Sequence, residues 1–152
     1  MLITIIDYDE KYVAETVAMW RASKEAALGQ PEKHDVASHQ HFLQNILPTY
    51  AEIWLAQVVA TGQIVGLLAL SANRIEQLYI DKDYQQKGIG SRLMGLAKER
   101  YPQGLTLYTM AENIGARAFY ERHGFTVIAE GWAEEEEMAD VLYEWGGVRV
   151  GG

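Results

Sequence analysis

The stretch QLYIDKDYQQKGIGSRLM, from Gln77 to Met94, decides how the rest of the chain is interpreted. It begins with an apolar run typical of a strand, passes through a polar turn, and reaches Gly88 and Gly90 just before a segment with helical spacing. Glycine lets a backbone approach a ligand closely, and the first turn of a helix carries N–H groups without acceptors. The stretch therefore predicts an anion site, of the kind that usually binds phosphate, where this helix begins.

Two well-known phosphate motifs do not fit the stretch. A P-loop needs the pattern G-x-x-x-x-G-K-S/T, which this sequence lacks. A dinucleotide-binding fingerprint needs a third glycine at the position that Leu93 occupies here. The spacing G-x-G alone would equally suit a plain glycine turn before a helix.

The apolar pattern along the whole chain predicts an α/β fold with a mixed (α+β) sheet. Its elements follow the order β-α-α-β-β-β-α-β-α-β-β, and no linker or internal repeat separates them. Residues 1–152 are therefore expected to form one domain, with Asp9 as the N-cap of the first helix and Gly29 as its stop. The expected strands cover 2–6, 53–59, 64–70, 74–80, 105–110, 125–132 and 141–145, and the expected helices cover 9–28, 37–47, 88–100 and 113–123.

Composition limits the class of protein. Apolar residues make up 49% of the 152 residues, enough for a core, yet no apolar run approaches the roughly 18–20 residues of a membrane helix. The first residues lack the basic segment and cleavage site of a signal peptide, so a cytoplasmic protein without membrane partners is expected. Since the chain has no cysteine, it has no disulfide, no thiolate metal site and no cysteine nucleophile.

The net charge of −8 argues against non-specific nucleic-acid binding, which needs a basic surface. The charge is uneven, because residues 81–122 hold seven Lys or Arg and five Asp or Glu, a balance of +2, while the remainder carries −10. Such a centre would suit an anionic cofactor beside a cationic substrate, although an ordinary scatter of surface charges would look the same.

Two motifs together resemble the GNAT superfamily, the acyl-CoA-dependent N-acetyltransferases. The phrase Q-x-x-G-x-G, from Gln85 to Gly90, is similar to the central motif of that family, Q/R-x-x-G-x-G/A. About 25 residues later, NIGARAFYERHGF, from Asn113 to Phe125, is similar to the next helix of the family, N-x-x-A-x-x-F-Y-x-x-x-G-F. The resemblance covers residues 2–147 by the order of elements and 76–125 by specific residues.

The resemblance implies a GNAT-like fold that binds acetyl-CoA. In the family, the strand before the glycine motif pairs with the pantetheine arm like an added strand, here through the backbone of Leu78, Tyr79 and Ile80. Asn113 would contact the same arm, and it could also cap its own helix. The pyrophosphate would be bound by the N–H groups of the cradle residues Gln85, Gln86, Lys87, Gly88, Ile89, Gly90 and Ser91.

The resemblance also implies direct attack of a substrate amine on the acetyl carbonyl. Tyr120 matches the tyrosine that the family places near the CoA sulfur, where it would protonate the departing thiolate or hydrogen-bond to it. An alkyl amine has a pKa of about 10 and must lose a proton first. Glu76 is the candidate base, because strand alternation is expected to put it on one face with Leu78 and Ile80. An exposed strand glutamate, or a carboxylate that attracts the substrate, would look the same.

Three further residues have candidate or structural roles under the same resemblance. Tyr108, on the next strand, is a weaker alternative to Glu76 as the base. The backbone N–H of Ile80 is the candidate donor to the oxyanion. Phe119, beside Tyr120, is expected to belong to the core.

A cluster of histidines invites comparison with a metal site. His34, His39 and His41 lie near Asp35, and histidine with carboxylate partners is a frequent ligand set. However, His39 and His41 are two residues apart on an expected helix and should point to different faces, so no metal is expected. The resemblance instead allows His34 or Asp35 to contact the substrate.

The C-terminal part contains an acidic run, Glu134 to Glu137, and two tryptophans. The run is either a solvated loop or a feature that attracts a cationic amine, since this connection lies near the acceptor cleft in relatives. Trp132 and Trp145 are expected in the core or at an interface, and the last strands could form a homodimer.

The sequence thus supports two functions of different kinds. The first is an acetyl-CoA-dependent N-acetyltransferase that acts on a primary amine of an unidentified small molecule or peptide. The second is a catalytically inactive GNAT-fold module that binds acyl-CoA as a sensor or an interaction partner.

Overall fold

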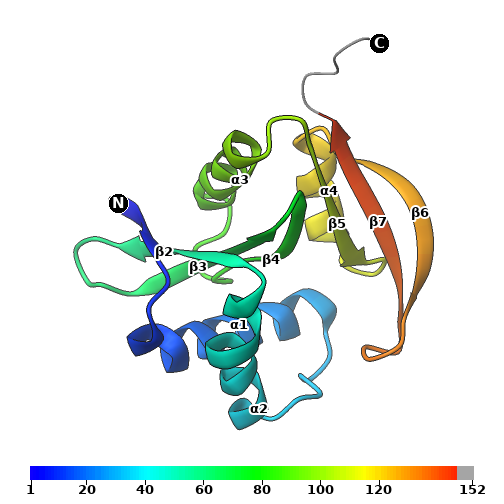
Figure 1. Cartoon of the computed structure of the whole chain (residues 1–152). Helices are drawn as coiled ribbons and strands as arrows, with labels where there is room; N and C mark the ends of the chain where they lie inside the picture. Colours follow the sequence, from blue (N-terminus) through cyan, green and yellow to red (C-terminus); the bar gives the residue numbers. More distant parts are fainter. Residues whose placement is uncertain (147–152) are drawn as a thin grey trace.

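Seven apolar segments pair into one mixed sheet in the computed structural model, which describes residues 1–146 (Figure 1). The strands lie in the order β1-β2-β3-β4-β5-β7-β6, and of these six pairs only β4 and β5 run parallel. The expected mixed sheet is confirmed, while residues 147–152 lie outside the described part of the chain. The strands are β1 (Ile3–Asp7), β2 (Glu52–Val58), β3 (Ile64–Ser71), β4 (Arg74–Ile80), β5 (Gly104–Met110), β6 (Thr126–Ala133) and β7 (Met138–Gly146).

The helices cover both faces of this sheet, with α1 and α2 on one face and α3 and α4 on the other (Figure 1). Together with the strands they follow the predicted order of elements. None of the helices in residues 1–146 is both long and apolar enough to span a membrane. The helices are α1 (Val13–Leu28), α2 (Val36–His41), α3 (Ile89–Arg100) and α4 (Ile114–Arg122), with the short turns η1 (Glu10–Tyr12), η2 (Phe42–Ile46) and η3 (Leu47–Thr49).

The start of the first helix differs from the prediction. Asp9 does act as a cap, since its side chain accepts a hydrogen bond from the Lys11 N–H at 2.9 Å, but the element that it caps is the 3₁₀ turn η1. α1 begins only at Val13 and ends, as expected, at Gly29, which has a φ of +66°. The cap residue was therefore correct and the expected start at residue 9 was too early by one turn.

The second helix is shorter than the expected range 37–47. Asp35 caps α2 by accepting from the Ser38 N–H at 2.7 Å, and after His41 the chain widens into the π turn η2. A wide turn shifts the buried face. As a result Leu43 and Leu47 are fully buried, whereas Ile46 is 42% exposed.

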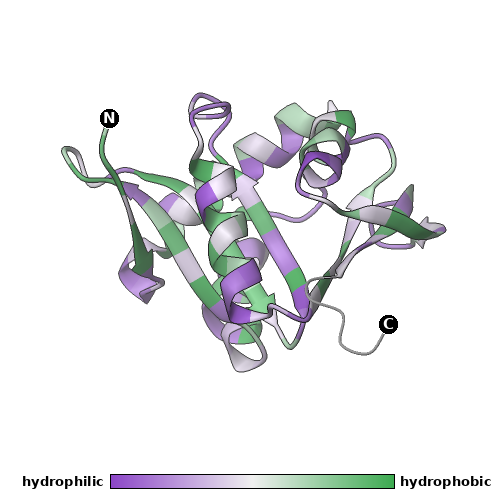
Figure 2. Ribbon diagram, turned by 90° about the horizontal axis from the view of Figure 1, so that it is seen from above, coloured by the Kyte–Doolittle hydropathy of each residue, from purple (hydrophilic) through white to green (hydrophobic). Residues whose placement is uncertain are grey.

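Two apolar clusters hold the layers together, one on each face of the sheet. β3 contributes to both, because Leu67 points to the α1 side and Leu68 to the α3 side, and every residue from Ile64 to Leu70 is buried. Figure 2 shows hydrophobic and polar positions alternating along other strands of the sheet. Packing on both faces thus fixes the position of β3, and pairing with β3 fixes the strands beside it.

β4 and β5 separate soon after they meet. Their parallel pairing is limited to Arg74 with Thr106 and Ile75 with Leu107, whereas β5 pairs with β7 along its full length. The sheet therefore opens between β4 and β5 toward the C-terminal end of β4. The glycine motif begins at this same end, after Ile80.

β6 forms an exposed edge. Seven of its eight residues are exposed, and Trp132 has 58% of its surface accessible, so of its two expected positions the core is excluded and an interface stays a prediction. Trp145 on β7 is half-buried and packs against Phe125, with ring centroids 6.4 Å apart. A homodimer through these strands stays a prediction.

Candidate functional site

The opening between β4 and β5 is the mouth of a cavity of about 1270 Å³. It is lined from both faces of the sheet, by α1 and the α1–α2 region on one side and by the start of α3 and by α4 on the other. All but two of the predicted site residues line it, the exceptions being Lys87 and Ile89. The lining site residues are Glu76, Leu78, Tyr79, Ile80, Gln85, Gln86, Gly88, Gly90, Ser91, Asn113 and Tyr120.

β4 presents unpaired backbone groups to this cavity. The Asp81 N–H donates to the Val65 carbonyl at 2.8 Å, so the backbone groups of Asp81 face β3. Because this direction alternates along a strand, the N–H and C=O groups of Tyr79 face β3 as well. Leu78 and Ile80 consequently point their N–H and C=O groups away from β3, into the opening. The Gln85 side chain donates to the Ile80 carbonyl at 3.3 Å, on this open side.

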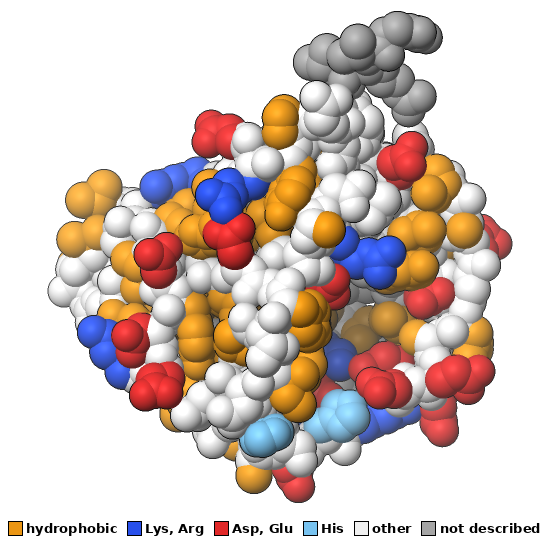
Figure 3. All heavy atoms as spheres, in the orientation of Figure 1, with side chains coloured by type: hydrophobic (Ala, Val, Ile, Leu, Met, Phe, Trp, Pro, Cys, Tyr) orange, Lys and Arg blue, Asp and Glu red, His pale blue; other side chains and the backbone are white. Residues whose placement is uncertain are grey.

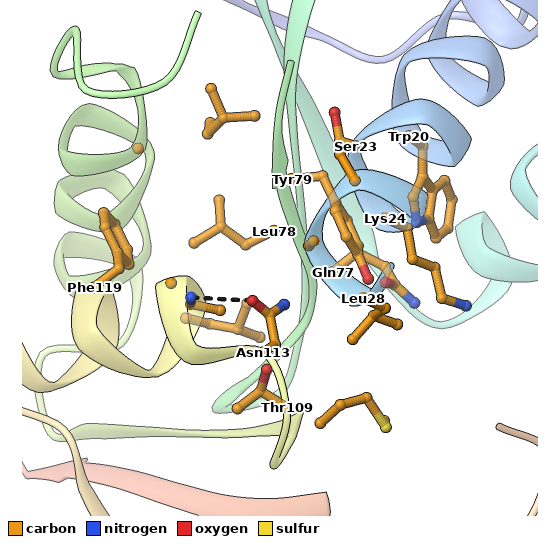
Figure 4. A pocket seen from close by; sticks show the side chains of 18 of the residues that line it. Trp20, Ser23, Lys24, Leu28, Gln77, Leu78, Tyr79, Thr109, Asn113 and Phe119 are labelled. Carbon is orange, nitrogen blue, oxygen red and sulfur yellow. Dashed lines mark hydrogen bonds between the residues drawn. The ribbon is translucent and has the colours of Figure 1, made fainter. Parts of the chain in front are cut away.

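The side chains of β4 point to opposite sides of the strand. Leu78 points toward Phe119, and Tyr79 points toward Trp20 and Lys24 (Figure 4). The rings of Tyr79 and Trp20 have centroids 5.8 Å apart, and burial raises the pKa of the Tyr79 phenol. One strand therefore contributes to both halves of the cavity.

The start of α3 carries free backbone donors. Gly88 occupies the N-cap position with a φ of +83°, and no side chain caps the helix there. The first intrahelical bond runs from the Arg92 N–H to the Gly88 carbonyl at 3.1 Å, which leaves the N–H groups of residues 89–91 without helical acceptors. A Cβ built on Gly88 meets no atom within 4 Å, so the space in front of these donors is open.

The two cradle residues outside the cavity lining have different surroundings. The Ile89 side chain is 2% exposed and belongs to the core, so only its backbone N–H could serve a ligand. The Lys87 side chain is exposed. Ser91 has a partner that the sequence did not suggest, because its hydroxyl lies 3.2 Å from Nε2 of His123.

Tyr120 is enclosed by aromatic rings. It is 7% exposed, and the centroids of Phe119, Phe125 and Tyr143 lie 5.6, 5.9 and 6.0 Å from its ring. Burial, with a smaller contribution from Tyr79, raises the pKa of the Tyr120 phenol well above its usual value of 10. The phenol is therefore protonated at neutral pH, and among residues 1–146 it has no hydrogen-bond partner.

Asn113 and Phe119 flank this region on α4. Asn113 caps α4, since its Oδ1 accepts from the Ala116 N–H at 3.2 Å, which confirms the capping role (Figure 4). It also lines the cavity. Phe119 is partly buried against the core, as expected, and its ring lines the cavity as well.

Glu76 sits at an irregularity in β4. Ile75 pairs with Leu70 and Gln77 pairs with Ala69, so Glu76 is an extra residue without a partner on β3. The Ser71 hydroxyl donates to its Oε1 at 2.5 Å. The bulge breaks the strict alternation, and the expectation that Glu76 shares a face with Leu78 and Ile80 is wrong.

Two tyrosines have positions relevant to the Glu76 carboxylate. Burial and then the charge of Glu76 raise the pKa of the Tyr50 phenol at the end of η3, a turn whose Leu47 belongs to the apolar cluster on the α1 side. Tyr108, the other candidate base, lines the cavity and is 51% exposed, with the Arg74 guanidinium 5.1 Å from its ring centroid.

At the α1 side of the cavity an ion-pair cluster joins segments far apart in the sequence. Lys24 Nζ lies 3.2 Å from Glu32 Oε2 and 3.1 Å from Glu136 Oε1. Lys33 donates to the Glu136 carbonyl at 2.7 Å and pairs with Glu137 at 3.3 Å. Two lysines therefore tie the β6–β7 turn to α1 and the loop after it, while Glu134, Glu135 and Glu137 are exposed.

Three residues that the sequence did not single out, Trp20, Lys24 and Glu32, also line the cavity. None of the three belongs to a motif of the sequence. Trp20 and Lys24 reach the site through contacts with Tyr79 and Glu136, which are distant in the sequence, and Glu32 joins them by its ion pair with Lys24.

The histidines separate as the spacing predicted. His39 is buried against Trp20, with ring centroids 4.2 Å apart, and His41 is exposed. Burial lowers the pKa of His39 to about 4.

Within the described chain, no three His, Asp or Glu side chains are grouped closely enough to hold a metal ion. His34 lines the cavity, while Asp35 is used as the cap of α2.

The sequence matches a family model described as "Acetyltransferase (GNAT) domain" over residues 49–127. Among curated proteins, it is 30% identical to the peptidyl-lysine N-acetyltransferase YjaB of Salmonella typhimurium, over 84% of this chain and 86% of that protein. It is 31% identical to the Escherichia coli protein of the same name, over 84% of each.

Solved structures share the fold over nearly the whole chain. The solution structure of apo-form YjaB from Escherichia coli superimposes with a TM-score of 0.80 and 25% identity, covering 97% of this chain and 100% of that one. The PaiA N-acetyltransferase from Thermoplasma acidophilum, solved in complex with coenzyme A, gives a TM-score of 0.75 at 20% identity, over 96% and 99% of the two chains. Because the identity to the PaiA protein is only 20%, this superposition shows a shared fold and nothing more.

Proposed function

The chain belongs to the GNAT acetyltransferase family, and on that premise we propose that it transfers an acetyl group from acetyl-CoA to a primary amine by direct attack in a ternary complex. The observation that carries the proposal is that one continuous cavity passes the unpaired C-terminal part of β4 and is lined from both faces of the sheet. Acetyl-CoA would enter from the α3 and α4 side and the acceptor from the α1 side, so both reactants can be present at once.

The residues on the α3 side fit the shape and charge of acetyl-CoA. The N–H groups at the start of α3 have no acceptors, and the open space in front of Gly88 leaves room for the pyrophosphate. The backbone groups of Leu78 and Ile80 face the opening and can pair with the amides of the pantetheine arm in the way that an added strand does.

The transfer forms a C–N bond and breaks the thioester C–S bond. Negative charge on the carbonyl oxygen would be met by the Ile80 N–H, which points into the opening. The amine must lose a proton, and Glu76 is the proposed acceptor of that proton, directly or through water, because its carboxylate lines the cavity on the acceptor side.

Tyr120 would stabilise the departing thiolate with a hydrogen bond. Burial raises the pKa of its phenol above 10, while an ordinary thiol has a pKa of about 8.5, so full proton transfer from the phenol to the thiolate is uphill. A hydrogen bond needs no such transfer. The proton that ends on the thiol would then come from the amine by way of the base or water.

The acceptor that we propose is the side-chain amine of a lysine in a protein or peptide. The curated relatives named above are peptidyl-lysine N-acetyltransferases, and the cavity is wide enough at the α1 side to be lined by three separate segments. A long unbranched side chain would reach the base candidate from that side.

Two measurements test the proposed function. Calorimetric titration should give selective binding of acetyl-CoA over NAD and ATP; a folded sample that binds none of them would contradict it. A screen of lysine peptides with acetyl-CoA should then release CoA thiol, which can be counted without background because the protein has no cysteine.

The variant Tyr120→Phe separates an enzyme from a binding module. It removes one oxygen from an enclosed ring, so acetyl-CoA affinity should stay within a few-fold while turnover falls by roughly 10²-fold or more. Wild-type turnover in this variant would remove Tyr120 from the mechanism, and the absence of turnover in the wild type would favour the inactive module.

A further inference from the structure

Charged side chains divide the cavity into two ends of different character. Near the start of α3 the lining charges are the cations of Lys82 and Arg122. At the α1 side the lining carboxylates, apart from the base candidate Glu76, are Glu32, Glu135 and Glu136. Figure 3 shows acidic side chains gathered beside the hollow, at the position of the β6–β7 turn in Figure 1.

The acidic end is not neutralised by its own lysine. Lys24 is the one lining ammonium among the described residues at this end, and it is shared between Glu32 and Glu136. The Glu32 side chain is 2% exposed, and its Oε2 has no hydrogen-bond partner in the described chain beyond the ion pair with Lys24. Glu135 makes no ion pair within residues 1–146. The acidic end of the cavity therefore carries more carboxylates than ammonium groups.

Neighbouring cations do not remove this excess. Lys33 pairs with the Glu137 carboxylate, donates to the Glu136 backbone carbonyl and does not line the cavity. His39 faces Trp20, Arg21 and the Lys24–Glu32 pair, and burial keeps its imidazole neutral at neutral pH. Glu135 is exposed and Glu136 is partly buried, and a surplus of negative charge at the wall of a cavity favours binding of a further cation.

We propose that Glu32, Glu135 and Glu136 form a specificity site that selects acceptors with a second positive charge beside the reacting lysine, such as an arginine or lysine next to it in a protein segment. The inference rests on the proposed function and deepens it. The carboxylates are of no use to the reacting amine itself, because they would hold it in the protonated form that cannot attack. They suit a neighbouring charge, which stays protonated throughout.

The test compares short capped peptides with one acceptor lysine and a single neighbour that is Arg, Gln or Glu, placed before or after that lysine. For the wild type, kcat/KM with Arg as the neighbour should exceed that with Glu by roughly tenfold at low salt, and the ratio should shrink in 0.5 M salt. The double variant Glu135→Gln/Glu136→Gln should lower the ratio to about twofold.

A matched control lies in the same acidic run. Glu134 and Glu137 do not line the cavity, so Glu134→Gln/Glu137→Gln changes the net charge equally and should keep the wild-type ratio. Equal loss of preference in both double variants, or an unchanged ratio in the first, overturns the specificity site. Turnover of all peptides at one rate overturns it too, while failure to acetylate any peptide overturns the proposed function itself.

Discussion

The ring of Phe119 closes over Gly90, so that a Cβ at Gly90 would lie 3.0 Å from Cε1 and 3.2 Å from Cζ of that ring. Gly90 belongs to the first turn of α3 and Phe119 to the middle of α4, and both line the cavity. This contact fixes how closely the two helices approach on the side where acetyl-CoA is expected to bind. A glycine motif that looks like a ligand feature is thus also a packing feature.

Gly90→Ala should weaken acetyl-CoA binding several-fold, because the added methyl group pushes Phe119 into the cavity. Alanine normally gains about 1 kcal/mol over glycine inside a helix, and the crowding should cancel that gain. The control is Gly95→Ala in the same helix, where a Cβ meets nothing within 4 Å. Calorimetry and urea unfolding should find Gly95→Ala more stable than the wild type with unchanged affinity. Equal behaviour of the two variants would show that the contact does not matter.

Gly88→Asn should abolish or strongly weaken acetyl-CoA binding while the protein stays folded. Gly88 has a φ of +83°, a conformation that asparagine tolerates better than other side chains, and its Cβ would project into the open space before the α3 donors. Gly29→Asn is the control, since Gly29 has a φ of +66°, equally open surroundings and no place in the cavity. Thermal unfolding should give a similar small loss for both variants. Normal acetyl-CoA affinity in Gly88→Asn would contradict the phosphate cradle.

The order of elements was predictable because each element carries its own local signal. The apolar run of β3, the stop at Gly29 and the glycine motif before α3 are all properties of adjacent residues, and each fell where it was expected. The proposed phosphate cradle is equally local, because it consists of one turn and the first residues of one helix, and its ligand stays a prediction. Boundaries were less certain, as the late start of α1 at Val13 illustrates.

The acceptor side was not predictable, because its geometry comes from pairing across the fold. The bulge at Glu76 exists only relative to the register of β3, and so strand alternation alone gave it the wrong face. The pairing of Lys24 with Glu136 joins residues 112 positions apart. The acidic run was visible in the sequence, but its attachment to two lysines depended on where the β6–β7 turn comes to lie.

Tyr143→Phe should lower the free energy of unfolding by about 1–3 kcal/mol, because the buried Tyr143 phenol ties α4 to β7. It accepts from Arg117 Nε at 3.0 Å and donates to Glu121 Oε2 at 2.6 Å, one turn of α4 apart. Tyr120→Phe is the matched control, since the Tyr120 phenol has no such partner among the described residues and its loss should change stability little. Urea unfolding of the two variants decides the point, and equal stability would show that the Tyr143 hydrogen bonds contribute nothing net.

His39 should make the protein sensitive to mild acid. An unfolded histidine binds a proton below about pH 6.5, whereas burial lowers the pKa of folded His39 to about 4. Between these values the unfolded state takes up a proton that the folded state does not, so the contribution of His39 is fully present above pH 6.5 and is lost as the pH falls toward 4. The expected loss is about 2–3 kcal/mol over that range.

The pH dependence of urea unfolding between pH 7 and 4.5 measures this loss. His39→Gln should be less stable than the wild type at pH 7, because it gives up the edge contact with Trp20, but its stability should fall less steeply toward pH 4.5. His41→Gln replaces an exposed histidine of the same helix and should keep the wild-type slope. His123, whose pKa burial also lowers, contributes in the same direction in all three proteins and cancels in the comparison. If the stability of His39→Gln falls with pH as steeply as that of the wild type, folded His39 takes up a proton without penalty. That result would contradict a neutral imidazole beside the Lys24–Glu32 pair.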